Sequence, residues 1–224
     1  ALDGGAASLG VATLQEGLEL RRAGLKAPIL LLSNLCDPED LRTCLEWQLM
    51  PTLSSLGDAK LCHALAEDSG RRFKVQLKID TGMSRLGCTL DDGAETTQAI
   101  QCLKNLVLEG IYSHLACADT PNHAMNATQL ACFRDMTDDL QIPRSLSATG
   151  GILLGPEYHF DLTRPGIGLY GGAPYSVAHP VVSLSQPVIQ IRDVMVGDTA
   201  GGGDTWSTRG RRRSGSDGTP GSTA

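Results

Sequence analysis

Short apolar runs alternate with amphipathic stretches along most of the chain. A run of four to eight apolar residues is typical of a buried strand, and apolar positions spaced three to four residues apart are typical of a helix that packs on one face. By this pattern we expect strands at residues 8–12, 29–33, 50–54, 74–80, 107–115, 145–148 and 161–170.

Helices are expected between these strands, and two of them carry clear start signals. Thr13 and Glu16 have the spacing of a capping box, and Asp37 is followed by Pro38, which suits the first helical position. The predicted helices cover residues 13–24, the segment that begins at 37, and residues 58–68, 95–106 and 124–140.

This order of strands and helices favours a parallel sheet with outer helices, an α/β fold. Seven strands fit two architectures: a (β/α)8 barrel that lacks one strand, or an open doubly wound sheet. No glycine-rich fingerprint follows the first strand, which favours the barrel. The residues before Ser8 are too few to supply a further strand and its helix, so we expect the first barrel strand to be absent.

Composition excludes several other classes. The net charge of −6 argues against nucleic acid as the main partner. No apolar run approaches the roughly 20 residues that span a bilayer, and the N-terminus lacks the basic and apolar blocks of a signal peptide. The seven cysteines include no Cys-x-x-Cys pair, which suits a reducing cytoplasm better than disulfides or a zinc site. We expect a cytoplasmic protein with no membrane partner and no metal.

The last segment differs from the rest. From Thr199 onward the chain is almost entirely Gly, Ser, Thr, Asp and Arg. Such a segment cannot bury enough apolar surface to fold alone, so residues 207–224 are predicted to be disordered. The abrupt change of composition is also what an out-of-frame translation produces.

Polar residues gather where three predicted strands end, and chemistry in a barrel lies at the carboxyl ends of its strands. The three segments are KIDTGMSRLG at 78–87, EGIYSHLACAD at 109–119 and HFDLTRPGIGLYGG at 159–172. Together with GVATLQEGLELRRAG at 10–24 and LSQPVIQIRDVMVGDT at 184–199, they resemble the alanine racemase family in the same order and at compatible spacing.

This resemblance covers about residues 1–206 and implies a fold-type III barrel that binds pyridoxal 5'-phosphate. It places barrel strands two to eight in residues 1–182 and the start of a C-terminal β domain in residues 183–206. The implied reaction interconverts L- and D-alanine, supplying D-alanine for peptidoglycan, in an enzyme that is a homodimer at full length. A broad-specificity or serine racemase stays open, as does a non-catalytic barrel or pseudoenzyme fragment.

The resemblance also assigns roles to single residues. Arg164 corresponds to the arginine that contacts the pyridine nitrogen of the cofactor, and His114 to a histidine in the hydrogen-bond network around it. Arg85 corresponds to the arginine near the phenolic oxygen of the cofactor and the substrate carboxylate, a pairing that suits its planar fork. Lys78 corresponds to a lysine that carries a carbamate and holds that arginine in place.

Phosphate binding is assigned to Thr149, Gly166 and Ile167. The hydroxyl of Thr149 and the backbone N–H groups of Gly166 and Ile167 would bind the phosphate, and glycine permits close approach of the backbone. Where the family often has Asn-Ser, this chain has Ala148 and Thr149, so the hydroxyl is kept and the amide is not.

Both proton-transfer residues of the family are missing from the motifs. The lysine to which the family attaches its cofactor lies in an ALKANAYG-like motif that this sequence does not contain. The catalytic tyrosine lies in a GYGATW-like segment, and Gly202 stands at its position. We therefore expect no catalytic residue in this chain, no racemase activity from it, and a reading frame that is truncated at the N-terminus and diverges near residue 200.

Overall fold

The computed structural model describes residues 1–172, 179–183, 185, 187, 190–197 and 212–216. These residues belong to two compact units, Ala1–His179 and Pro180–Ala224. All of the residues to which the sequence assigns a binding role lie in the first unit.

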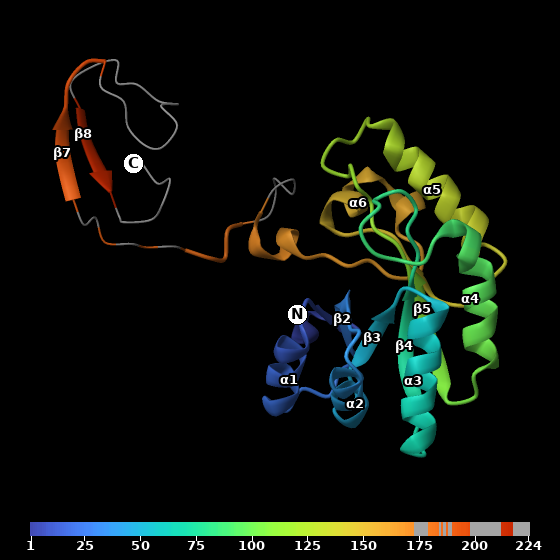
Figure 1. Cartoon of the computed structure of the whole chain (residues 1–224). Helices are drawn as coiled ribbons and strands as arrows, with labels where there is room; N and C mark the ends of the chain where they lie inside the picture. The colour runs from blue at the N-terminus through green and yellow to red at the C-terminus, as the bar shows by residue number, and fades with distance from the viewer. Residues whose placement is uncertain (173–178, 184, 186, 188–189, 198–211, 217–224) are drawn as a thin grey trace. The chain divides into compact units, whose positions relative to one another are not determined.

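The first unit is built on a sheet of six parallel strands whose spatial order is their order in the chain (Figure 1). Its strands are β1 (Leu9–Val11), β2 (Ile29–Asn34), β3 (Met50–Leu53), β4 (Phe73–Lys78), β5 (Leu106–Tyr112) and β6 (Arg144–Ser145). A helix follows each of the first five strands, so every crossover is a βαβ unit. A parallel sheet with this connectivity curls toward a barrel, as the repeated strand-and-helix pattern predicted.

The helices are α1 (Leu14–Arg22), α2 (Pro38–Glu46), α3 (Leu56–Asp68), α4 (Leu90–Cys102), α5 (Ala124–Thr137) and α6 (Thr149–Leu154). Three short 3-10 helices are η1 (Leu2–Gly4), η2 (Pro156–Tyr158) and η3 (Ile167–Tyr170). The predicted capping box is present: the Thr13 side chain accepts from the Glu16 backbone N–H, and the Glu16 carboxylate accepts from the Thr13 N–H. Asp37 also caps α2 as predicted, accepting from the backbone N–H of Glu39.

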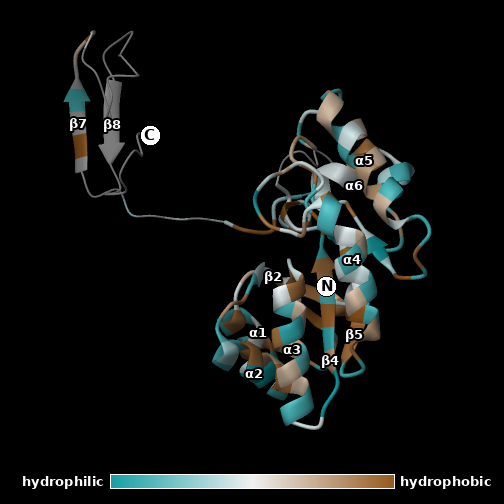
Figure 2. Cartoon of the chain, turned by 45° about the vertical axis from the view of Figure 1, so that its right-hand side comes forward, coloured by the Kyte–Doolittle hydropathy of each residue, from teal (hydrophilic) through white to brown (hydrophobic). Residues whose placement is uncertain are grey.

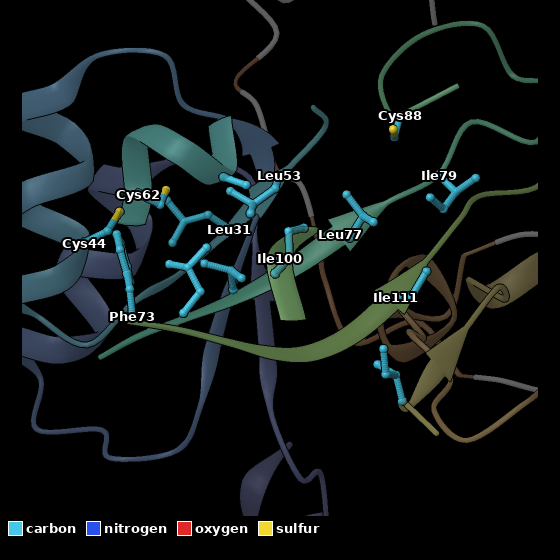
Figure 3. Close-up of a cluster of buried hydrophobic side chains, with 14 of the residues drawn as sticks. Leu31, Cys44, Leu53, Cys62, Phe73, Leu77, Ile79, Cys88, Ile100 and Ile111 are labelled. Atoms are coloured by element: carbon cyan, nitrogen blue, oxygen red, sulfur yellow. The ribbon is translucent and has the colours of Figure 1, made fainter. Parts of the chain in front are cut away.

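One face of the sheet packs against the helices and forms the main core (Figure 3). Leu31, Phe73 and Leu77 from the strands and Ile100 from α4 are almost completely buried there. Figure 2 shows hydrophobic residues concentrated on the strands, whereas the helices carry both hydrophobic and hydrophilic residues. The helices thus have one buried face and one solvated face, as an α/β fold requires.

The opposite face of the sheet carries a smaller and more polar set of side chains. Because side chains alternate along a strand, the residues between those of the main core point to this face. Leu30, Met50 and Tyr112 form a small apolar cluster here. Thr52 and Lys78 are buried on the same face, as this alternation requires. This polar face leads to the carboxyl ends of β4, β5 and β6.

Three local expectations were wrong. Residues 161–170 form no strand: Arg164 makes a single parallel bridge with Ala148, and η3 follows. Pro165 has no N–H to donate, and three glycines follow it within six residues, so a continuous ladder cannot form. Helix α4 begins at residue 90 rather than 95, and the strand expected at residues 145–148 is reduced to β6, Arg144–Ser145.

The second unit contains an antiparallel pair, β7 (Gln190–Val194) and β8 (Arg212–Ser216). β8 lies within residues 207–224, for which the composition predicted disorder. Strand pairing uses backbone hydrogen bonds, which need no apolar side chains, so composition does not exclude it. The segment 201–206, which contains Gly202, lies outside the described residues.

Within the described ranges the structure contains neither a membrane-spanning helix nor a cluster of metal-binding side chains. No helix there is long and apolar enough to cross a membrane. No group of three or more His, Cys, Asp or Glu side chains in the same ranges is arranged to hold a metal ion.

Candidate functional site

The candidate site lies at the carboxyl ends of β4, β5 and β6, where two of the predicted residues, Lys78 and Arg164, lie over one aromatic ring. Lys78 ends β4 and pairs in register with Tyr112, which ends β5. The Lys78 ammonium lies 5.7 Å from the centre of the Tyr112 ring, and the Arg164 guanidinium lies 4.9 Å from it. Lys78 reaches the ring from the neighbouring strand β4, and Arg164 reaches it from the segment that bridges to Ala148, beyond β6.

Arg164 is held by backbone and hydroxyl oxygens. Its Nη2 donates to the carbonyls of Ser113, at 2.6 Å, and Leu146, at 3.2 Å, and its Nη1 donates to the Ser145 hydroxyl. Among the residues that the structure describes, no carboxylate pairs with this guanidinium. Burial lowers the pKa of Arg164 from 12.5 to about 10, and Tyr112 offsets this in part. At neutral pH the side chain therefore remains a cation, fixed in place and without a counter-charge.

Lys78 is the second cation of the site. It is only 6% exposed, and no acidic side chain of the described chain lies within ion-pair distance of it. Burial lowers its pKa below the ordinary value, the charges of Arg85 and Arg164 lower it further, and Asp80 opposes them. A larger fraction of the amine is therefore neutral, and nucleophilic, than in an exposed lysine.

Tyr112 connects this site to the centre of the sheet. Its hydroxyl lies 2.8 Å from the Thr52 hydroxyl, which in turn lies 2.6 Å from the Leu31 carbonyl. The carbonyl can only accept, so Thr52 donates to it and the Tyr112 hydroxyl must donate to Thr52. Burial raises the pKa of Tyr112. The ring is thus held as a neutral phenol beneath both cations.

His114 follows β5 and is partly exposed. Burial lowers its pKa from 6.5 to about 4, with contributions from the charges of Arg164, Lys78 and Arg85. The imidazole is therefore neutral at physiological pH. The resemblance implied a hydrogen-bond network between His114 and Arg164; in the described chain no direct hydrogen bond joins them, and the coupling between them is electrostatic.

Arg85 lies on the loop that follows β4 and is exposed, without a hydrogen bond to any described residue. The loop itself is well defined. Cys88 pairs with Ile79 in a parallel bridge, and the Asp80 carboxylate accepts from the backbone N–H groups of Gly82, at 2.9 Å, and Ser84, at 3.0 Å. The guanidinium is thus free to bind an anion from a loop of fixed shape.

The predicted phosphate-binding residues lie together at the start of α6 and η3. The Thr149 hydroxyl accepts from the backbone N–H groups of Gly166 and Gly168, each at 3.1 Å. Its own proton remains available to an acceptor, and the N–H of Ile167 makes no hydrogen bond within the described part of the chain. A Cβ at Gly168 would lie 2.7 Å from Thr149, so only glycine fits there, whereas the space around Gly166 is open.

This arrangement suits an anionic, planar ligand. Two cations without carboxylate partners lie over an aromatic ring, a third is free on the neighbouring loop, and N–H and O–H donors converge at Thr149. Two surface hollows of the described part of the chain lie elsewhere, one lined by residues such as Arg42 and Arg71 and the other by residues such as Asp138 and Arg144. Neither contains a group that could perform this chemistry, so the open carboxyl edge of the sheet is the stronger candidate.

Fold and site together define a parallel α/β barrel-type domain with cationic side chains at the carboxyl edge of its sheet. The family model for the N-terminal domain of alanine racemase matches residues 1–174. The chain therefore belongs to the alanine racemase family, which confirms the resemblance and the fold class predicted from the sequence.

Individual relatives agree with this assignment. The alanine racemase of Ruegeria sp. is 49% identical over 204 residues, which cover 90% of this chain and 56% of the relative. That of Prochlorococcus marinus is 45% identical over 201 residues, covering 86% of this chain and 52% of the relative. The chain thus spans slightly more than half the length of these relatives.

Solved structures show the same fold. Alanine racemase from Streptomyces coelicolor matches 96% of this chain and 62% of its own, with a TM-score of 0.79 and 31% identity. The enzyme from Bartonella henselae, solved with covalently bound pyridoxal phosphate, gives a TM-score of 0.75 at 27% identity over 96% of this chain and 61% of its own.

Several residues around the site were not identified from the sequence. Ser113, Ser145 and Thr52 were read as ordinary strand residues, and the importance of Tyr112 was missed. The alternation of side chains could have indicated Tyr112 and Lys78, because both end strands that pair with one another. Arg164 donates to the Ser145 hydroxyl and to two backbone carbonyls, and the carbonyls leave no signal in the sequence.

Proposed function

We propose that this chain is the cofactor-binding half of an alanine racemase, an enzyme that uses pyridoxal 5'-phosphate to interconvert L- and D-alanine. One observation carries the proposal: uncompensated cations and a cluster of N–H and O–H donors lie together at the carboxyl edge of a racemase-type sheet. In the proposed division, residues 1–182 are the barrel, residues 183–206 begin a β domain, and the full-length protein is a cytoplasmic homodimer.

The residues present fit the cofactor. Of the groups predicted to bind its phosphate, the Thr149 hydroxyl and the Ile167 N–H would contact it directly, whereas the Gly166 N–H donates to Thr149 and would hold that hydroxyl in place. Arg164 would donate to the pyridine nitrogen. Because a guanidinium releases its proton reluctantly, even with its pKa lowered to about 10, that nitrogen would stay largely unprotonated. The bound cofactor supplies the electron sink that makes the α-proton of an amino acid acidic.

The remaining residues would bind and orient the amino acid. Arg85 would pair with its carboxylate and with the phenolic oxygen of the cofactor, in the bidentate geometry that arginine favours. Lys78 is neutral more often than an exposed lysine. Its amine would add to carbon dioxide and lose a proton to solvent, leaving an anionic carbamate. That group would supply the negative charge that the two neighbouring arginines lack. His114, held neutral, would not add a further positive charge.

The second candidate function is that of a barrel that binds cofactor without catalysing racemisation. The positions of the five lysines favour it. Four of the five lie away from the site: Lys74 pairs with Glu109 and Lys104 with Glu67, Lys26 follows α1, and Lys60 is on α3. Lys78 is buried among arginines. None is placed to hold the cofactor covalently, so the polypeptide of 224 residues is proposed to be inactive. Specificity for alanine over serine or other amino acids is proposed from the relatives alone.

Binding of pyridoxine 5'-phosphate tests the site directly. This analogue has an alcohol in place of the aldehyde, so it cannot react with surface lysines. Equilibrium dialysis should show binding that weakens about tenfold in Thr149→Val, which loses a charge-assisted hydrogen bond to the phosphate.

The matched control is Thr137→Val, since Thr137 is equally buried and donates to the Phe133 carbonyl at 2.6 Å, on a different helix. It should bind the analogue as tightly as the unaltered chain. Equal binding of pyridoxine and pyridoxine 5'-phosphate, or equal loss in both variants, would remove the proposed phosphate site.

A further inference from the structure

A buried amide on α5 links the backbone of the candidate site to the neighbouring loop. Gln129 is completely buried, and each of its polar atoms is used. Its Nε2 donates to the Thr81 hydroxyl at 3.1 Å and to the His114 carbonyl at 2.9 Å, and its Oε1 accepts from the Ala116 N–H at 2.8 Å. The last two groups belong to the chain just beyond β5, where the ladder has ended and gives them no strand partner.

The same network reaches the other residues of the site. The Thr81 hydroxyl lies 2.8 Å from the Ser113 hydroxyl, and the Ser113 carbonyl accepts from Arg164. Thr81 is on the loop between β4 and α4, the loop that also carries Arg85. Three segments with proposed binding residues are therefore connected through Gln129 and the two hydroxyls.

The amide of Gln129 contributes to stability, because an apolar side chain in its place would leave the His114 carbonyl and the Ala116 N–H without these hydrogen bonds. Stability alone does not account for its third hydrogen bond, which reaches the Thr81 hydroxyl on the loop that carries Arg85. The amide therefore also fixes positions. Its hydrogen bonds hold the His114 carbonyl and the Thr81 hydroxyl, and with Thr81 the loop that carries Arg85, on either side of the same side chain. A fully satisfied buried network restricts a site to one geometry.

We infer that Gln129 is a positioning residue of this site, which sets the distances between His114, the Arg85 loop and Arg164 without touching the ligand. The inference rests on the proposed function, because it names a further residue of the proposed cofactor site. It also makes a claim that can be measured without cofactor: the imidazole of His114 is held close to the three cations by Gln129.

Asn126 provides a matched control on the same helix. It is 1% exposed, and its Nδ2 donates to the carbonyls of Thr120, at 3.1 Å, and Pro121, at 3.4 Å. Both carbonyls belong to the loop before α5, and neither is connected to a proposed binding residue. Replacing this amide removes a comparable number of buried hydrogen bonds and leaves the site network intact.

The experiment compares Gln129→Met and Asn126→Leu with the unaltered chain. The first measurement is the pH titration of the His114 imidazole by NMR, assigned by its loss in His114→Asn. The facing charges are Lys78 on β4, Arg85 on the following loop and Arg164 after β6. In Gln129→Met the imidazole should move away from them, and its pKa should rise from about 4 to about 5 or above. In Asn126→Leu it should not change.

The second measurement is the affinity for pyridoxine 5'-phosphate, which should weaken about tenfold in Gln129→Met only. If Gln129→Met does not fold, Gln129→Asn replaces it, since that amide adds no charge but is one methylene too short to reach the same partners. An unchanged His114 titration in the folded variant, or an equal change in Asn126→Leu, would overturn the inference. If the titration changes as expected but no chain binds the analogue, the positioning role stands and the proposed function fails.

Discussion

Replacing Lys78 with Met should stabilise the fold while it damages the site. The ammonium is buried on the polar face of the sheet, has no carboxylate partner among the described residues, and lies near two arginines. Methionine keeps the apolar stem and removes the charge. The variant therefore separates two contributions to the free energy of unfolding: the unfavourable burial of the charge and the favourable packing of the apolar stem.

The magnitude follows from two opposing effects. Removing a buried charge of this kind is worth about 1–3 kcal/mol, and losing its contact with the Tyr112 ring, 5.7 Å away, costs about 0.5–1 kcal/mol. We expect a net gain of about 1–2 kcal/mol in the free energy of unfolding. With a urea m-value of about 2 kcal/mol/M, the midpoint should rise by roughly 0.5–1 M.

The titration of Lys78 also makes the free energy of unfolding depend on pH, in a direction that can be predicted. The pKa of Lys78 is below 10.5 in the folded chain and near 10.5 in the unfolded chain, so between these values the unfolded chain binds more protons. Stability of the unaltered chain should therefore rise with pH through this window. In Lys78→Met this contribution should be gone.

The assay is urea unfolding at about pH 7 and about pH 9 in buffer free of carbon dioxide, followed by far-UV circular dichroism. Lys74→Met is the matched control, because Lys74 is on the same strand but is 66% exposed and paired with Glu109 at 2.7 Å. It should lose at most about 1 kcal/mol and keep the pH dependence. A loss of stability in Lys78→Met, or an unchanged pH dependence, would refute the reasoning. Added bicarbonate should stabilise only chains that retain Lys78.

Three further predictions concern other parts of the molecule. Arg21 donates to four backbone carbonyls around the start of β2 and the end of α2, so Arg21→Met should lower the free energy of unfolding by about 2 kcal/mol, and Arg22→Met by less than about 1 kcal/mol, in urea titrations. Arg85→Ala should weaken competition by acetate for pyridoxine 5'-phosphate binding at least several-fold, measured by dialysis, because it removes the free guanidinium. Deuterium exchange at Cα of alanine, followed by NMR with added pyridoxal phosphate, should proceed equally with and without the chain; a protein-dependent rate would show a catalytic base at a position not yet considered.

Strong local signals explain why most of the fold could be predicted. The first five strands are apolar runs bounded by loop residues, and the caps at Thr13 and Asp37 use side chains next to the helices that they begin. The start of α4 was missed although Thr89 caps it, because the weak helix formers Gly93 and Thr96 follow directly. Such residues lower the helical signal where tertiary packing decides the outcome.

The site could be predicted only where a motif carried it. The segments around Arg85, His114 and Arg164 identified the binding residues, but their contacts come from distant parts of the chain. Gln129 bonds to backbone groups that follow another strand, and nothing in the residues around it indicates this. The final predicted strand failed for a related reason: the backbone at Pro165 and beyond folds to present N–H groups toward Thr149 instead of a neighbouring strand.

The consecutive order of the six strands has a consequence for how the protein is made. Every strand pairs with the strand synthesised just before it, as when Leu9 pairs with Ile29 and Ile111 with Arg144. Each pairing closes a loop the length of one crossover, and short loops cost little entropy and close quickly. The domain can therefore form as the chain leaves the ribosome, one βαβ unit at a time, without waiting for its C-terminal residues. At each stage the newest strand is covered by the next one to emerge, whereas the outer edge of β1 has no partner within the six-stranded sheet.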